Sequence, residues 1–141
     1  MLAYRPLLRL PPSIMTDPRP AADIWLFRLA AAFNYAVAVS LLLPSTIPLM
    51  GLPGPVHPLY LHLCAALIAV FGFSYHLVAR DPGRNHGIVL VGVVGKLLVF
   101  ALLCGHFLAD HIPSLLLVLG AGDLVLAILF MRFLMARRRD A

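Results

Sequence analysis

One lysine, Lys96, lies near the middle of the apolar run Ile88–Leu108. An ammonium at the centre of a transmembrane helix costs about 2.5–3.5 kcal/mol on insertion scales, so it should face protein and have a partner. Asp123, in the apolar run Ser114–Leu134, can supply that partner. At the α-helical rise, the depths below one membrane surface are about 12 Å for Lys96, 16 Å for Asp123 and 15 Å for Asn34. The sequence therefore predicts a buried polar layer of these three residues.

Small residues flank the polar side chains at helical spacing. Gly92 lies four residues before Lys96, and Gly120 and Ala127 lie three residues before and four after Asp123. Small residues let helix backbones approach closely, which would bring the two charges together. Ionisable groups inside a membrane mark proton or ion paths, so one interpretation is a proton- or ion-coupled site. The other is a structural ion pair that fixes the register of the helices.

A second polar group collects at the opposite ends of the same runs. Its members are His57, His62, His106, Asp110 and His111. Antiparallel packing would set His62 and His106 level, and Asp110 follows His106 by four residues, on the same helix face. Two to four imidazoles with a carboxylate could bind zinc, copper or iron, and His62 with His106 could hold one b-type haem. The alternative is a set of interfacial histidines without a ligand.

The cysteines and the remaining motifs add little chemistry. Cys64 and Cys104 share a level, but each lies two residues from a histidine, about 200° around the helix, which disfavours a Cys₂His₂ site. Buried free cysteines are the simpler interpretation. The sequence has no G-x-S-x-G, H-E-x-x-H or P-loop pattern and no Glu. We therefore expect a non-enzymatic protein and favour no cofactor, with a transition metal or b-type haem as the alternative.

The composition places these residues in a membrane protein. The chain has 141 residues, of which 62% are hydrophobic and 12% charged, whereas a soluble domain is about 45–50% apolar and 25% charged. The formal net charge of +5 does not indicate nucleic acid, because the arginines occupy short flanks beside apolar runs. We expect the lipid bilayer as partner and no nucleic acid.

Four apolar runs are each long enough to cross about 30 Å of hydrocarbon. They predict an all-α bundle of four antiparallel transmembrane helices with spans at about 24–43, 59–78, 88–108 and 114–134. Residues 1–23, with several prolines, are expected to lie at the membrane interface, and residues 135–141 to form a basic tail. Of the 11 basic residues, all but Lys96 lie in the two termini, the middle loop or the adjoining span ends. The positive-inside rule therefore predicts both termini and the middle loop in the cytoplasm.

The middle loop, ARDPGRNHG, offers a site for phosphate. Arg80, Arg84 and Asn85 lie within it, and the N-terminus of the following helix adds a favourable dipole. Basic loops beside spans commonly contact lipid headgroups. We expect the same of these three residues.

The segments FRLAAAFNY, ARDPGRNHGIVLVGVVGKLLVF and GDLVLAILFMRFL resemble small four-span bacterial inner-membrane proteins over residues 24–134. In size and span count the chain is also similar to DoxX-like proteins. The resemblance implies a fold and an inner-membrane location but no activity. From the residues we expect an accessory subunit, or a bundle that handles a small solute or ion. Because so short a chain encloses little volume, transport would need a homo-oligomer. An accessory subunit would belong to a larger membrane complex.

Overall fold

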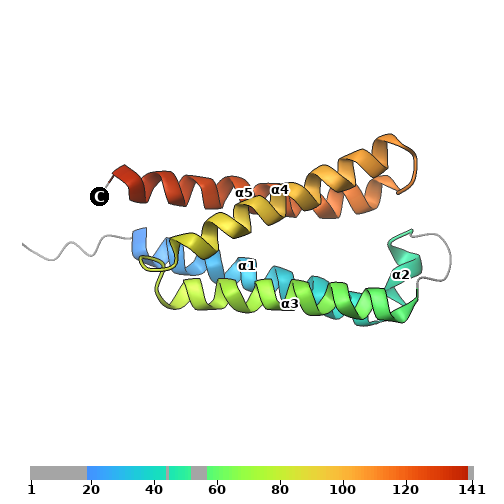
Figure 1. Cartoon of the computed structure of the whole chain (residues 1–141), viewed down its shortest axis with the longest axis horizontal. Coiled ribbons are helices and arrows are strands. Elements are labelled where there is room, and N and C mark those ends of the chain that lie inside the picture. Colours follow the sequence, from blue (N-terminus) through green and yellow to red (C-terminus); the bar gives the residue numbers. More distant parts are fainter. Residues whose placement is uncertain (1–18, 44, 52–56, 140–141) are drawn as a thin grey trace, which may run out of the picture.

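The computed structural model describes residues 19–43, 45–51 and 57–139. This part of the chain folds into helices joined by short loops. They are α1 (Arg19–Leu42), α2 (Thr46–Leu49), α3 (Pro58–Arg80), α4 (His86–Leu108) and α5 (Ser114–Arg139). The four long helices are long and apolar enough to cross a membrane, and successive ones run in opposite directions (Figure 1). The predicted all-α bundle with four candidate spans is thus confirmed, and a multi-pass membrane protein is indicated.

Local sequence signals explain where the helices begin. Pro58 occupies the first position of α3, and Nδ1 of His57 accepts a hydrogen bond from the backbone N–H of Leu59 at 3.2 Å. Proline suits the first helical turn because its missing N–H would have no partner there. Before α4, the Asn85 side chain donates to the backbone carbonyl of Asp81 at 2.8 Å and closes the middle loop.

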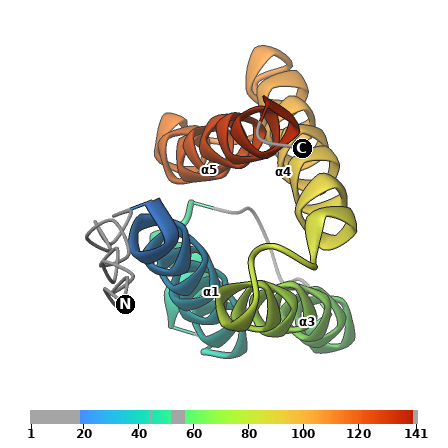
Figure 2. The same cartoon turned by 90° about the vertical axis from the view of Figure 1, so that its left-hand side faces the viewer.

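The four long helices form two pairs. Helix α1 packs along α3, and α4 packs along α5, whereas contacts between the pairs are less extensive. Figure 2 shows the α1–α3 pair and the α4–α5 pair as two separate layers. Close packing within the first pair depends on Gly72 of α3, because a Cβ there would lie 3.0 Å from the Tyr35 ring and 3.3 Å from the Ala31 carbonyl oxygen of α1.

The two pairs share a core at one end of the molecule. We name this end, where α1 begins, α5 ends and the middle loop Asp81–Asn85 lies, the basic end. The opposite end, with α2 and the loop Ala109–Pro113, is the histidine end. Every long helix contributes buried residues to the core, all but Ala31 from its half nearest the basic end: Phe27, Ala30, Ala31, Tyr75, Val78, Ala79, Val89, Val93, Phe130 and Phe133.

Beyond this core the pairs separate. Lys96 is the last buried residue of α4, and all later residues of that helix are at least partly exposed. Figure 1 shows the two pairs diverging toward the histidine end. The polar side chain of Lys96 therefore lies at the boundary between the packed half of the bundle and its open half.

The helix bounds differ from the predicted spans mainly at the basic end. Helix α1 begins at Arg19, five residues before the predicted span, and α5 continues through the predicted basic tail to Arg139. Alanine, methionine and arginine are good helix formers. Ala21 and Ala22 in α1, and the segment MARRR of residues 135–139 in α5, therefore favour continued helix outside the apolar runs. Residues 1–18 of the predicted interfacial segment, and residues 140–141 of the tail, lie outside the described residues.

Candidate functional site

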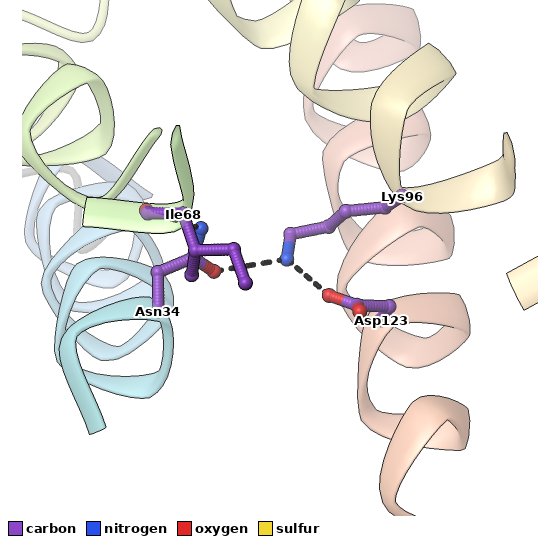
Figure 3. Close-up of polar contacts among 4 residues, drawn as sticks. All are labelled: Asn34, Ile68, Lys96 and Asp123. Carbon is purple, nitrogen blue, oxygen red and sulfur yellow. Dashed lines mark hydrogen bonds and ion pairs between the residues drawn. The ribbon is translucent and has the colours of Figure 1, made fainter. Parts of the chain in front are cut away.

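Lys96 makes the central polar contacts of the bundle. Its Nζ donates to Oδ1 of Asp123 at 2.5 Å and to Oδ1 of Asn34 at 3.2 Å, as Figure 3 shows. The Lys96 side chain is 5% exposed and that of Asp123 is 19% exposed. A buried ammonium is stabilised only when hydrogen bonds and an opposite charge replace its lost water. Here the carboxylate supplies the charge and the amide a second acceptor.

Asn34 extends the contacts of Lys96 to the first helix pair. While its Oδ1 accepts from Lys96, its Nδ2 donates to the backbone carbonyl of Ile68 at 3.3 Å. The resulting network has members in all four long helices, namely Asn34 in α1, Ile68 in α3, Lys96 in α4 and Asp123 in α5 (Figure 3). The Lys96–Asn34 hydrogen bond joins one helix pair to the other, whereas the Lys96–Asp123 ion pair lies within the second pair. The structure therefore brings together the three residues of the expected polar layer.

Two aromatic rings complete the surroundings of the ammonium. Nζ of Lys96 lies 5.4 Å from the ring centroids of both Phe33 and Tyr75. At this distance the negative face of an aromatic ring attracts a cation. Sequence reasoning missed both rings, because aromatic residues recur throughout these apolar runs. The one available signal was that Phe33 adjoins Asn34.

Each of these rings packs on a glycine of the other helix pair. A Cβ on Gly92 of α4 would lie 2.8 Å from Cε1 of Tyr75, and a Cβ on Gly122 of α5 would lie 3.0 Å from Cζ of Phe33. Glycine thus permits the close approach of the pairs at the level of Lys96. Gly120, which the sequence also marked, instead faces Leu103 of α4, within the second pair.

The histidine candidates divide into a close pair and a separate residue. Nδ1 of His106 and Nδ1 of His111 lie 3.4 Å apart. His62 belongs to the first turns of α3, whose end diverges from that of α4 in both views (Figures 1 and 2). Within the described ranges, no three His, Cys, Asp or Glu residues gather as a metal site. Asp110 lies between the paired histidines with a left-handed backbone, φ 57°.

The predicted headgroup residues are on the middle loop and in the last turn of α3. Arg80 and Arg84 are exposed, and the Arg84 guanidinium lies 4.0 Å from the Asp81 carboxylate. Asn85 uses its amide to hold the backbone of Asp81. The two arginines thus remain accessible at the basic end, while Asn85 shapes the loop.

A second ion pair at the basic end was not anticipated. Arg137 of α5 donates to Oδ2 of Asp23 of α1 at 2.8 Å, and their side chains are 35% and 21% exposed. The guanidinium also lies over the ring of Phe133, 5.5 Å from its centroid. Because Asp23 and Arg137 fall outside the predicted spans, depth counting gave no reason to pair them. This contact joins the two helix pairs at the basic end, outside the Lys96 network.

Comparison of the chain with protein-family models, with curated protein sequences and with solved structures found no match. The features of the molecule that point to a function are the geometry of the polar network and that of the histidine pair.

Proposed function

We propose that the protein is a non-enzymatic membrane protein that handles a proton or small ion at the Lys96–Asp123 pair. The observation that supports this is that the Lys96 ammonium makes more stabilising contacts than the Asp123 carboxylate does. Lys96 contacts a carboxylate, an amide oxygen and two aromatic rings. Asp123 accepts through Oδ1 from Lys96 alone among the described residues, and it is the more exposed of the two.

This inequality makes Asp123 the exchangeable member of the pair. A proton or cation arriving at the carboxylate would compete with Lys96 for its charge. The displaced ammonium would still have the amide oxygen of Asn34 at 3.2 Å and the two rings at 5.4 Å. A buried cation that keeps such contacts tolerates the loss of one partner better than an isolated charge. The pair can thus change its protonation or ion occupancy without exposing a bare ammonium.

The position of the pair also favours ion handling. Lys96 follows the first residue of α4, His86, by ten positions, about 15 Å along the helix axis. The packed core lies toward the basic end, and the two helix pairs diverge toward the histidine end (Figure 1). We propose that an ion reaches Asp123 from the histidine end and that passage toward the basic end requires the core to rearrange.

Flux measurements on vesicles test the proposal. Purified protein is placed in vesicles that contain a pH-sensitive dye, and the decay of an imposed pH gradient is followed with different salts outside. We expect faster decay than in empty vesicles, and loss of that excess in Asp123→Asn. Asp23→Asn, which alters the ion pair at the basic end, is the matched control and should keep the flux. Wild-type flux equal to that of empty vesicles for protons and for every salt would refute ion handling.

A role as an accessory subunit is the second candidate, and the exposed apolar surface favours it. Only 17–28% of the most apolar window of each long helix is buried, so most of this surface is available to lipid or to other subunits. We propose self-association or membership of a larger membrane complex on this basis. Cross-linking in native membranes tests it, and a protein that remains monomeric at all densities would contradict it.

We further propose that the protein resides in a bacterial inner membrane, the location that its resemblance to small four-span proteins implies, and that both termini lie in the cytoplasm. The support is the distribution of basic residues over the termini and the middle loop. Single cysteines introduced at Gly83 and at Ser114 into a variant lacking Cys64 and Cys104 can be labelled with an impermeant thiol reagent in intact cells. Labelling at Ser114 only is expected, and labelling at Gly83 only would reverse the orientation.

A further inference from the structure

We infer that His106 and His111 form a chelating site for a first-row transition metal ion that prefers imidazole, with Zn²⁺ as its probe. The two imidazoles come from the last turn of α4 and from the loop that follows it. Neither takes part in the polar network of Lys96. This inference is independent of the proposed ion handling, because it concerns the C-terminal end of α4, whereas Lys96 lies near the middle of that helix.

The backbone at the end of α4 brings the two side chains together. The N–H of His111 bonds to the carbonyl of His106 at 2.9 Å, and the N–H of Asp110 bonds to that of Phe107 at 3.0 Å. These two bonds, with a left-handed residue between them, define the Schellman motif that ends many helices. Asp110 takes the left-handed position with φ 57°, which aspartate tolerates better than most residues. The motif brings the residue after the left-handed position close to the third residue from the helix end, and here both are histidines.

The separation of the two nitrogens fits metal chelation. A tetrahedral zinc ion with Zn–N bonds of about 2.0–2.1 Å and angles of about 109° requires ligand nitrogens about 3.3–3.4 Å apart. The Nδ1 atoms of His106 and His111 are 3.4 Å apart. Their ring centroids lie 5.6 Å apart with an interplanar angle of 47°. A single ion could therefore bind both nitrogens without a change in the backbone.

The surroundings leave room for an ion and its other ligands. Both histidines are exposed, and both line a shallow hollow of about 420 Å³ on the surface of α4. The small residues Ala101, Gly105 and Ala109 line the same hollow. Since small side chains leave space beside the imidazoles, water can complete the coordination. A second copy of the chain could do so as well, because the hollow is on the exposed face of α4.

Zinc titration of the untagged full-length protein in detergent micelles tests the inference. Zn²⁺ competes between the protein and a fluorescent zinc indicator, and the stoichiometry is measured together with the oligomeric state. We expect saturable binding that is lost in His106→Ala and in His111→Ala. One ion per chain would indicate completion by water, whereas one ion per two chains, with zinc-dependent dimers, would indicate completion by a second copy. Both results support the site.

Two sets of variants separate this site from other zinc ligands. His62→Ala and His57→Ala remove histidines from the same end of the molecule and should leave zinc binding unchanged. Asp110→Gly keeps the left-handed turn and should also retain binding. Asp110→Val keeps both ligands but disfavours the turn, so binding should weaken about 5–30-fold. Circular dichroism checks that each variant keeps its helix content.

Three results would overturn the inference. They are wild-type protein that binds no zinc, zinc binding that survives His106→Ala combined with His111→Ala, and equal loss of binding in His62→Ala. If Asp110→Val binds as tightly as Asp110→Gly, the turn does not organise the ligands, and the chelation geometry argued above is wrong.

Discussion

Removal of one member of the Lys96–Asp123 pair should destabilise the bundle more than removal of both. Breaking a buried ion pair on one side typically costs about 3–5 kcal/mol, because the remaining charge has no partner. For Lys96→Met we expect the lower part of this range, since the stranded Asp123 is 19% exposed and can be hydrated. For Asp123→Leu we expect a cost within the same range, since the stranded Lys96 is only 5% exposed but keeps the Asn34 oxygen at 3.2 Å and the two rings at 5.4 Å.

The double variant, Lys96→Met with Asp123→Leu, should recover most of that loss. Its residual cost should come mainly from Oδ1 of Asn34, which loses its donor, at about 1–3 kcal/mol. Detergent titration of the purified protein, followed by circular dichroism, gives the free energy of unfolding for each variant. If the cost of the double variant equals the sum of the single costs, the two residues are not partners and the reasoning fails.

A matched experiment at the basic end calibrates this result. The Asp23–Arg137 pair has a similar geometry, 2.8 Å, but its side chains are 21% and 35% exposed. Both of these side chains are partly exposed, and ion pairs that water reaches contribute about 0–1 kcal/mol, so Asp23→Asn should change the free energy of unfolding less than Lys96→Met does. A cost equal to that of Lys96→Met would show that burial does not set the difference between the pairs.

Substitution of alanine for three glycines should give three different stability changes in the same unfolding assay. Gly92→Ala should destabilise by about 1–3 kcal/mol, because the new Cβ would lie 2.8 Å from the rigid ring of Tyr75. Gly120→Ala should cost less than about 1 kcal/mol, because the atom it meets is Cδ1 of Leu103, the end of a flexible side chain. Gly105→Ala, with no neighbour within 4 Å, should stabilise by up to about 1 kcal/mol. The reverse order for Gly92 and Gly105 would contradict the packing described here.

The polar layer could be anticipated because a membrane restricts where charge can lie. A single lysine inside an apolar run needs a partner, and Asp123 was the one carboxylate at comparable depth within a predicted span. Depth counting needs only the start of each run and the α-helical rise, both of which sequence supplies. The contacts of Lys96 with Asp123 and Asn34 could therefore be predicted without knowing which helices are neighbours.

The arrangement of the helices was not accessible in the same way. Four antiparallel spans with short loops allow several neighbour relations, and the sequence did not choose the pairing of α1 with α3 and α4 with α5. Without that pairing, the contact of Phe33 with Gly122 and of Tyr75 with Gly92 could not be assigned. It also remained open whether His62 and His106 would be neighbours, because two residues at the same depth need not lie on helix ends that contact each other.

The prediction that His106 and Asp110 lie on one helix face was wrong for a different reason. The four-residue spacing of His106 and Asp110 suggests one helix face, and that inference assumes that the helix continues. The helix instead ends at Leu108, and Asp110 adopts φ 57°. The residue that meets His106 is therefore His111, five positions on. The left-handed residue after a helix C-cap is usually glycine, so the aspartate at this position did not indicate that the helix ends here.

The position of Lys96 at the boundary between packed and open halves has a physical cause. Lipid tails are as apolar as leucine side chains, so moving an apolar side chain from lipid into a helix interface yields little free energy. Helices in a membrane therefore associate through close packing and polar contacts. Toward the basic end, glycines and aromatic rings provide close packing between the pairs. The Lys96–Asn34 bond is the polar contact between pairs nearest the open half. Any event that weakens the hold of Asp123 on Lys96 would therefore act at the point where the two helix pairs begin to separate.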